Sequence, residues 1–228
     1  MKKFSVIIAI ILAVTFVLCS CNNNTYTTLS GSKTTAPAGN TADGNDLFEN
    51  ESAESDETNS AEGEHPQVKF TMENGGSFIM ELYPEYAPQT VENFVELVSE
   101  GFYDGLTFHR VVEDFMAQGG DPEGTGMGGS SKKIKGEFAI NGFEQNVLSH
   151  TRGVVSMARS SSYNSASSQF FICYSDATFL DGQYAAFGMV IQGMEVVDSF
   201  LEVERTMGSD GALSKPVEPI VIEKAEVL

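Results

Sequence analysis

The feature that most constrains the fold of this chain is a series of short strand-like segments joined by glycine-rich turns. The first two, QVKFTME and GSFIMELY, alternate or nearly alternate apolar and polar residues around an NGG turn, which is typical of a β-hairpin. The later segments are LTFHRVV, FMAQGG, GVVSMA, SQFFICY, YAAFGMVI and EPIVIEKAEVL. Short strands in this number predict a mainly β domain, built as a closed antiparallel barrel.

Two segments have helical periodicity instead. In APQTVENFVELVSEGF, apolar residues recur at the spacing i, i+3, i+4 and i+7 of an amphipathic helix. These residues are Val91, Phe94, Val95 and Val98. Gly101 follows at the expected helix end. The second segment is GMEVVDSFLEV. We expect both helices to cover the ends of the barrel.

The N-terminus has the composition of an export signal. Lys2 and Lys3 precede an apolar run of about fifteen residues, which is shorter than the roughly 20 that a membrane-spanning helix needs. The following LCSC resembles the bacterial lipobox. We therefore predict a lipoprotein signal peptide over residues 1–20 and a fatty-acylated (palmitate-bearing) Cys21. An uncleaved anchor and an ordinary signal peptide are the alternatives, and each of them also exports the protein.

Residues 21–64 would then form the lipidated N-terminus and a tether. This segment is rich in Asn, Thr, Ser and Gly, and it holds nine acidic residues but no basic one between Gly39 and His65. Such a segment buries too little apolar surface to offset its chain entropy, so we expect it to be disordered. The protein would be held at the outer face of the cytoplasmic membrane, in a bacterial cell envelope.

Residues 65–228 are long enough for one domain with a sizeable core. The formal net charge is −19 for the whole chain, and it is −13 without the nine acidic residues and three lysines of the N-terminal part. This acidity argues against nucleic-acid binding. The three histidines lack metal-ligand spacing and no dinucleotide fingerprint or P-loop is present, so we predict no metal and no cofactor. Cys173, in an apolar strand, is expected to be a buried structural thiol.

The stretch TFHRVVEDFMAQGGD places one guanidinium, Arg110, within a strongly apolar strand. Two explanations are open. Arg110 either points to solvent and pairs with Glu113 or Asp114, or it belongs to a functional site. The long, mostly irregular segment Gly119–Arg152 that follows favours a site nearby, because long loops in compact domains are usually functional.

Five motifs resemble, in order and spacing, those of the cyclophilin-type peptidyl-prolyl cis–trans isomerases. They are FHRVVEDFMAQGGD, GTGMGG, GVVSMA, SQFFI and FLDGQYAAFG, and the resemblance extends over Gln67–Leu228. It implies a closed eight-stranded antiparallel β-barrel capped by two α-helices, with a substrate groove on its outer face. It also implies isomerisation of X-Pro bonds without metal or cofactor, by a monomer.

The resemblance assigns roles to particular residues. The catalytic positions fall on Arg110 and Gln118. The substrate-binding positions fall on His109, Phe115, Met116, Ala158, Arg159, Phe171, Phe179, Leu180 and Tyr184.

Three of these positions depart from the common family pattern. Phe179 stands where many members have tryptophan, Tyr184 where many have histidine, and Arg159 where an asparagine is usual. The tryptophan is implicated in drug binding, so we expect weak cyclosporin binding.

These inferences predict a peptidyl-prolyl isomerase that assists the folding of exported polypeptides. One alternative is a module on the same fold that binds proline-containing segments without catalysis. A hydrolase using a residue of the run SSSYNSASSQ is a further alternative, but this run lacks the G-x-S-x-G elbow.

Overall fold

The computed structural model describes residues 65–228. The predicted signal peptide, the lipid acceptor Cys21 and the acidic tether lie outside the described residues. Within the described part of the chain, no helix combines the length and the apolar character that crossing a membrane requires.

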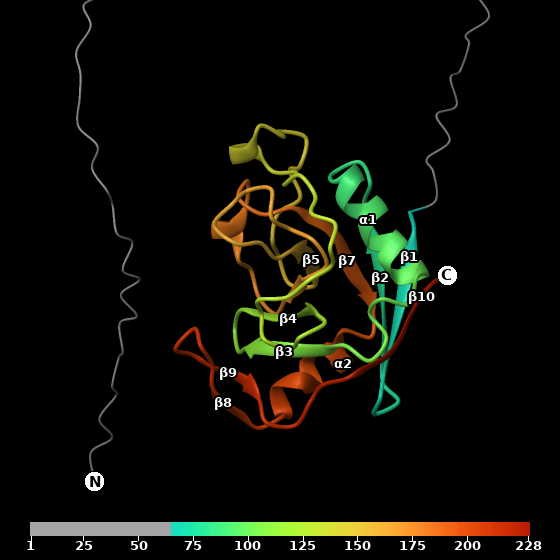
Figure 1. Cartoon of the computed structure of the whole chain (residues 1–228), viewed down its shortest axis with the longest axis vertical. Helices are drawn as coiled ribbons and strands as arrows, with labels where there is room; N and C mark the ends of the chain where they lie inside the picture. Colours follow the sequence, from blue (N-terminus) through green and yellow to red (C-terminus); the bar gives the residue numbers. More distant parts are fainter. Residues whose placement is uncertain (1–64) are drawn as a thin grey trace, which may run out of the picture. The chain divides into compact units, whose positions relative to one another are not determined.

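Eight antiparallel strands form one curled sheet (Figure 1). They are β1 (Gln67–Met72), β2 (Ser77–Leu82), β3 (Thr107–Val112), β4 (Met116–Asp121), β5 (Val154–Met157), β6 (Phe170–Cys173), β7 (Ala186–Gln192) and β10 (Ile222–Val227). Their order in the sheet is β10-β1-β2-β7-β5-β6-β4-β3. The predicted hairpin is confirmed: Phe70 of β1 lies directly opposite Phe78 of β2, and the two rings stack with centroids 5.1 Å apart.

The prediction of a closed barrel was wrong. The sheet is a curled half-barrel with β3 and β10 at its two edges. An isolated bridge between Thr107 and Val221, with backbone hydrogen bonds from Phe108 to Ile220 and from Ile222 to Leu106, links the edges without a continuous ladder. A second hairpin, formed by β8 (Arg205–Met207) and β9 (Leu213–Pro216), explains why the ladder stops there. Strand β9 packs against β3 (Figure 1), where a closing strand would have to continue.

Both predicted helices are present. Helix α1 (Pro88–Ser99) begins with proline, whose missing N–H costs nothing in the first turn, and Gly101 follows its end with a positive φ of 70°. The buried positions of α1 include Val91, Phe94 and Val98, as the periodicity predicted. Helix α2 (Met194–Ser199) is short and continues as a 3₁₀ turn, η3 (Phe200–Glu202).

The main core lies on the concave side of the sheet and is rich in aromatic residues. Phe94 of α1 packs against Phe70, Phe170 and Phe187, with ring centroids between 5.0 and 6.4 Å apart. Alternating burial along β1 and β2 places one face of each strand in this core. Cys173 is fully buried in β6, as predicted, and burial raises the pKa of its thiol to about 12.

The loop after β4 is organised by one carboxylate. Asp121 accepts hydrogen bonds from the backbone N–H groups of Glu123, Thr125, Gly126 and Gly128. Burial alone raises the pKa of Asp121, but these donors outweigh it and bring the pKa below its ordinary value. An internal carboxylate therefore fills the glycine-rich GTGMGG turn, which shapes the chain beside the site.

Candidate active site

One cavity brings together ten of the eleven residues that the resemblance marks as catalytic or substrate-binding. It has a volume of about 360 Å³ and lies on the outer face of the sheet. Its lining is Arg110, Phe115, Met116, Gln118, Ala158, Arg159, Phe171, Phe179, Leu180 and Tyr184. His109 is the exception, since it faces an adjoining hollow beside Gly124 and Met127.

The floor of this cavity is a second apolar cluster, separate from the main core. Met116, Phe171 and Leu180 are buried within it, together with Cys173. Phe115 and Tyr184 pack against the cluster from the rim. An apolar floor of this kind suits a proline ring, which gains free energy when its carbons leave water.

Strand register explains how the polar residues reach the rim. Arg110 of β3 pairs directly with Gln118 of β4, and a bulge at His109 separates this pair from the preceding pair of Phe108 and Gly119. Because the bulge adds one residue, Phe108 can face the core while Arg110 faces the cavity. Met116 and Gln118, two residues apart, share the cavity face as the strand period predicts.

Phe115 reaches the cavity from a turn rather than from a strand. Asp114, just before it, adopts a φ of 59°, which is uncommon for a residue other than glycine. The chain therefore reverses sharply between β3 and β4. This reversal directs the Phe115 ring to the rim, where its centroid lies 5.7 Å from that of Phe179.

Arg110 is held from two sides. Its Nε donates to Oδ2 of Asp210 at 2.6 Å, and Nη1 lies 3.4 Å from Oε1 of Gln118 and 3.8 Å from the sulfur of Met116. Its Cζ also lies 5.9 Å from the centre of the Phe115 ring. The ion-pair partners considered from the sequence, Glu113 and Asp114, are not the observed ones.

Gln118 belongs to a short amide relay. Its Nε2 donates to Oε1 of Gln169 at 2.8 Å, and Nε2 of Gln169 donates to the carbonyl of Gly128 at 2.7 Å. Gln169 was not among the predicted site residues, although it stands in the SQFFI motif. The relay fixes the orientation of the Gln118 amide, so that its oxygen faces Arg110.

Arg159, the departure from the family asparagine, forms a wall of the cavity. Its guanidinium donates to the carbonyls of Gln183 and Ser160, at distances between 2.9 and 3.1 Å. It also lies over the ring of Tyr184, with Cζ 4.4 Å from the centroid. These contacts hold the cation against the wall, which leaves the cavity open above its apolar floor.

A Ser–His–Asp arrangement, in which the serine and the histidine are buried and the aspartate is exposed, lies behind the cavity. His150 Nδ1 lies 2.8 Å from Oδ1 of Asp181, and Nε2 lies 2.9 Å from Oγ of Ser156. Ser156 is completely buried, so no substrate carbonyl can reach its hydroxyl. This arrangement therefore supports the Phe171 ring, against which His150 stacks, and it does not support a hydrolase.

This arrangement predicts a dependence of stability on pH. Burial lowers the pKa of His150, against the opposing effect of Asp181, so the folded chain keeps this imidazole neutral. Below about pH 6.5, His150 binds a proton in the unfolded chain but stays unprotonated in the folded chain until the pH is lower. The contribution of His150 to the free energy of unfolding should therefore be fully present above about pH 6.5 and should be lost progressively as the pH decreases.

The free energy of unfolding can be measured in urea at pH 7.5 and 5.5. We expect it to be lower at pH 5.5, and the share of the decrease that is due to His150 should be at most about 1.4 kcal/mol per pH unit. The variant His150→Gln should show a shallower decrease over the same interval. An equally steep decrease in that variant would assign the effect to other groups.

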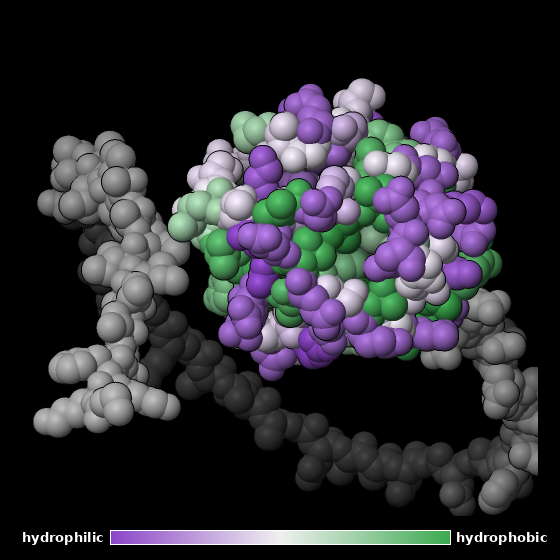
Figure 2. Space-filling model, turned by 90° about the horizontal axis from the view of Figure 1, so that it is seen from below, coloured by the Kyte–Doolittle hydropathy of each residue, from purple (hydrophilic) through white to green (hydrophobic). Residues whose placement is uncertain are grey.

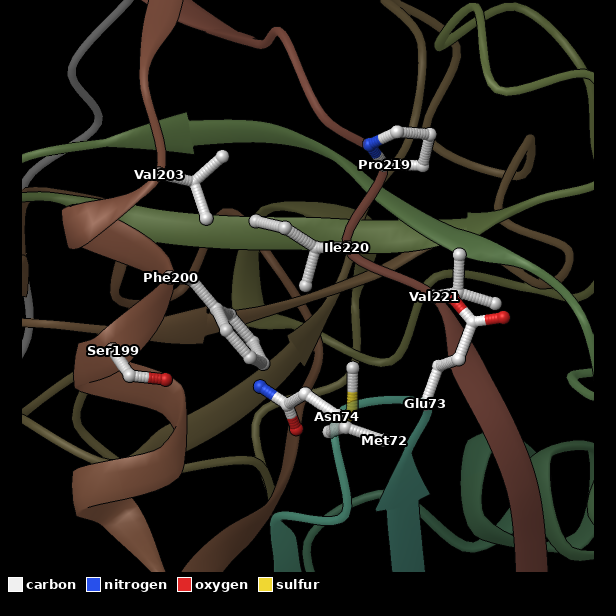
Figure 3. Close-up of a pocket in the computed structure, with 9 residues that line it drawn as sticks. All are labelled: Met72, Glu73, Asn74, Ser199, Phe200, Val203, Pro219, Ile220 and Val221. Carbon is white, nitrogen blue, oxygen red and sulfur yellow. The ribbon is translucent and has the colours of Figure 1, made fainter.

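One further cavity within residues 65–228 contains none of the predicted site residues. Figure 3 shows a small cavity of about 120 Å³ between η3, the residues after β1 and the segment that precedes β10. Phe200, Val203 and Ile220 supply much of its lining, and the hydroxyl of Ser199 already donates to the carbonyl of Val196. No group of three or more histidine, cysteine or acidic side chains in residues 65–228 is arranged to hold a metal ion.

Comparison with known proteins decides the family. The family model described as cyclophilin type peptidyl-prolyl cis-trans isomerase/CLD matches residues 67–227. The chain belongs to this family. It is 42% identical over 153 residues to a peptidyl-prolyl cis-trans isomerase of Schizosaccharomyces pombe, a match that covers 67% of this chain and 94% of the relative.

Two further relatives agree. Peptidyl-prolyl cis-trans isomerase B of Bacillus subtilis is 47% identical over 126 residues, covering 55% of this chain and 84% of the relative. A Cryptosporidium parvum cyclophilin-type isomerase, solved in the presence of the dipeptide Ala-Pro, superposes with a TM-score of 0.60 at 31% identity. That match covers 71% of this chain and 98% of the solved one. The chain is therefore a peptidyl-prolyl cis–trans isomerase of the cyclophilin type.

Proposed function

We propose that this isomerase acts on X-Pro bonds of exported polypeptides and assists their folding outside the cytoplasmic membrane, where it is held by a lipid on Cys21. The observation that carries the catalytic part is the position of Arg110, a cation fixed at the rim of an apolar cavity. The Ala-Pro dipeptide used with the Cryptosporidium relative is of the size and chemistry that such a cavity would accept.

The reaction requires rotation about an amide bond. The barrier is about 18–20 kcal/mol, because the nitrogen lone pair is delocalised into the carbonyl. Twisting the bond localises the lone pair on the proline nitrogen, which then becomes a better hydrogen-bond acceptor. A donor placed at this nitrogen binds the twisted state more tightly than either planar state, and such differential binding lowers the barrier.

Arg110 can supply this donor. Its Nε–H is engaged by Asp210 and one Nη1–H faces Gln118, whereas no hydrogen bond within residues 65–228 uses Nη2. N–H groups of the guanidinium therefore remain for a substrate above the cavity floor. The proline ring would lie against Met116 and Phe171, and Gln118 would orient the neighbouring carbonyl.

One hydrogen bond does not account for the whole acceleration. Raising the rate from roughly 10⁻² to 10³ per second corresponds to five decades, or about 7 kcal/mol. A charge-assisted hydrogen bond contributes about 1.5–3 kcal/mol. The remainder would come from holding both sides of the bond, with the ring in the apolar cavity and the flanking backbone near Ala158 and Arg159.

The catalytic proposal is tested by following cis-to-trans conversion of a proline-containing tetrapeptide with the purified chain. Conversion no faster than in buffer would remove it. The alternative is a module that binds proline segments without catalysis, which the ion pair of Arg110 with Asp210 favours because it partly neutralises the cation. Affinity for the peptide without accelerated conversion would establish that alternative.

The anchor is tested separately in bacterial cells supplied with a labelled fatty acid. The wild-type chain should incorporate the label, Cys21→Ala should incorporate none, and the matched control Cys19→Ala should remain labelled, because Cys19 would leave with the signal peptide. Label that persists in Cys21→Ala would contradict the proposed acceptor.

A further inference from the structure

The hairpin β8–β9 reaches the candidate active site. Its turn is closed by the backbone N–H of Gly208, which donates to the carbonyl of Ala212 at 2.8 Å, and Gly211 supplies the positive φ of 75° that the turn requires. Asp210 lies within this turn. Seen from below in Figure 2, apolar and polar residues are interspersed over the surface of the domain.

The two oxygens of Asp210 make different contacts. Oδ1 accepts from the backbone N–H of Ala212 at 3.0 Å and from the hydroxyl of Ser214 at 2.9 Å. Oδ2 accepts from Nε of Arg110 at 2.6 Å. The first pair of bonds fixes the carboxylate to the hairpin, so Arg110 meets an acceptor whose position is already set.

This contact restrains a side chain that is otherwise mobile. An arginine side chain has about 2 kcal/mol of rotamer entropy, and the Arg110 side chain is 31% exposed. Asp210 holds its Nε while Gln118 and Met116 contact its Nη1. Two restraints on different atoms define the plane of the guanidinium, and this plane determines whether the remaining N–H groups point over the cavity.

We propose that Asp210 is a positioning residue for Arg110, which keeps the guanidinium directed at the cavity. The inference rests on the proposed catalytic function and adds a residue that lies 100 positions away in the chain. A positioned donor should matter more in the twisted state than in the planar one, because only the twisted nitrogen needs it. The loss of Asp210 should therefore lower kcat and leave KM nearly unchanged.

The sharpest variant is Asp210→Asn. The amide oxygen can still accept from Ala212 and Ser214, which preserves the hairpin, whereas the amide NH₂ then faces the Nε–H of Arg110, donor against donor. We expect kcat for a prolyl tetrapeptide to fall about five- to tenfold, with KM within twofold of wild type. In ¹⁵N NMR spectra without substrate, the Arg110 Nε–H should exchange with water faster than in the wild-type chain.

Two controls separate positioning from general damage to the hairpin. Thr206→Ala removes a different hydrogen bond of the hairpin, from the Thr206 hydroxyl to the carbonyl of Lys215, and keeps the Asp210 carboxylate and both of its turn hydrogen bonds, so it should retain wild-type kcat. In the Arg110→Ala background, Asp210→Asn should produce no further loss, since there is no guanidinium left to position.

An unchanged or raised kcat in Asp210→Asn would overturn the inference, and so would an equal loss in the Arg110→Ala background. A wild-type chain without isomerase activity would overturn the proposed function, and the positioning role with it. The Nε–H exchange would then still report whether the ion pair forms, so the two failures are distinguishable.

Discussion

The variant Arg110→Ala is expected to lower kcat/KM for a proline-containing tetrapeptide about 100-fold. This factor corresponds to about 2.7 kcal/mol, which lies within the range of one charge-assisted hydrogen bond lost from the transition state. The loss should appear mainly in kcat, because the apolar floor of Met116 and Phe171 still binds the proline ring. Protease-free measurement of cis-to-trans conversion at several substrate concentrations separates kcat from KM.

The variant Arg110→Lys is the matched control, since it keeps the charge and removes the planar fork. An ammonium group cannot bond Asp210 and Gln118 in the geometry that the guanidinium uses, so we expect activity to stay at least tenfold below wild type. Full activity in either variant would show that the barrier is lowered without this cation.

The variant Phe115→Ala should weaken substrate binding about tenfold, seen as a raised KM. Phe115 forms the rim of the cavity between Phe179 and Arg110, and its removal exposes the proline site to water. A tenfold change corresponds to about 1.4 kcal/mol, close to the contribution of one partly buried aromatic side chain. Unfolding in urea should change little, because the side chain lies outside the main core.

Two further variants serve as controls for the raised KM that is expected in Phe115→Ala. Phe115→Leu keeps an apolar side chain at the rim and should recover most of the affinity. Val147→Ala, at a residue that is 73% exposed and outside the cavity lining, should bind the peptide as the wild-type chain does. A wild-type KM in Phe115→Ala would mean that the substrate does not use this rim.

Much of the fold could be predicted because its signals are local. The NGG turn, the alternating residues of β1 and β2, and the helical spacing of Val91, Phe94 and Val98 each act within a few residues, and the structure confirms these elements. The open edge between β3 and β10 could not be predicted this way. It depends on β8–β9 packing against β3, a contact between segments about 100 residues apart.

The candidate site, like the fold, combines features that the local sequence predicts with features that it does not. Met116 and Gln118 share a face because of the strand period, and that part followed from spacing alone. The bulge at His109, the positive φ of Asp114 and the ion pair with Asp210 had no sequence signal that we recognised. The ion pair joins residues 100 positions apart, and the bulge depends on how β3 pairs with β4, so local preference specifies neither of them.

The central claim is that a cation fixed over an apolar cavity accelerates rotation about a prolyl amide. Exchange NMR on a proline-containing peptide tests it most directly, because one spectrum reports both binding and interconversion. With the wild-type chain present at catalytic amounts, exchange cross-peaks should connect the cis and trans signals. With Arg110→Ala at the same concentration, the peptide should still bind, while the cross-peaks weaken because the catalysed exchange rate falls about 100-fold. Cross-peaks of equal intensity with both proteins, or none with the wild-type chain, would contradict the account.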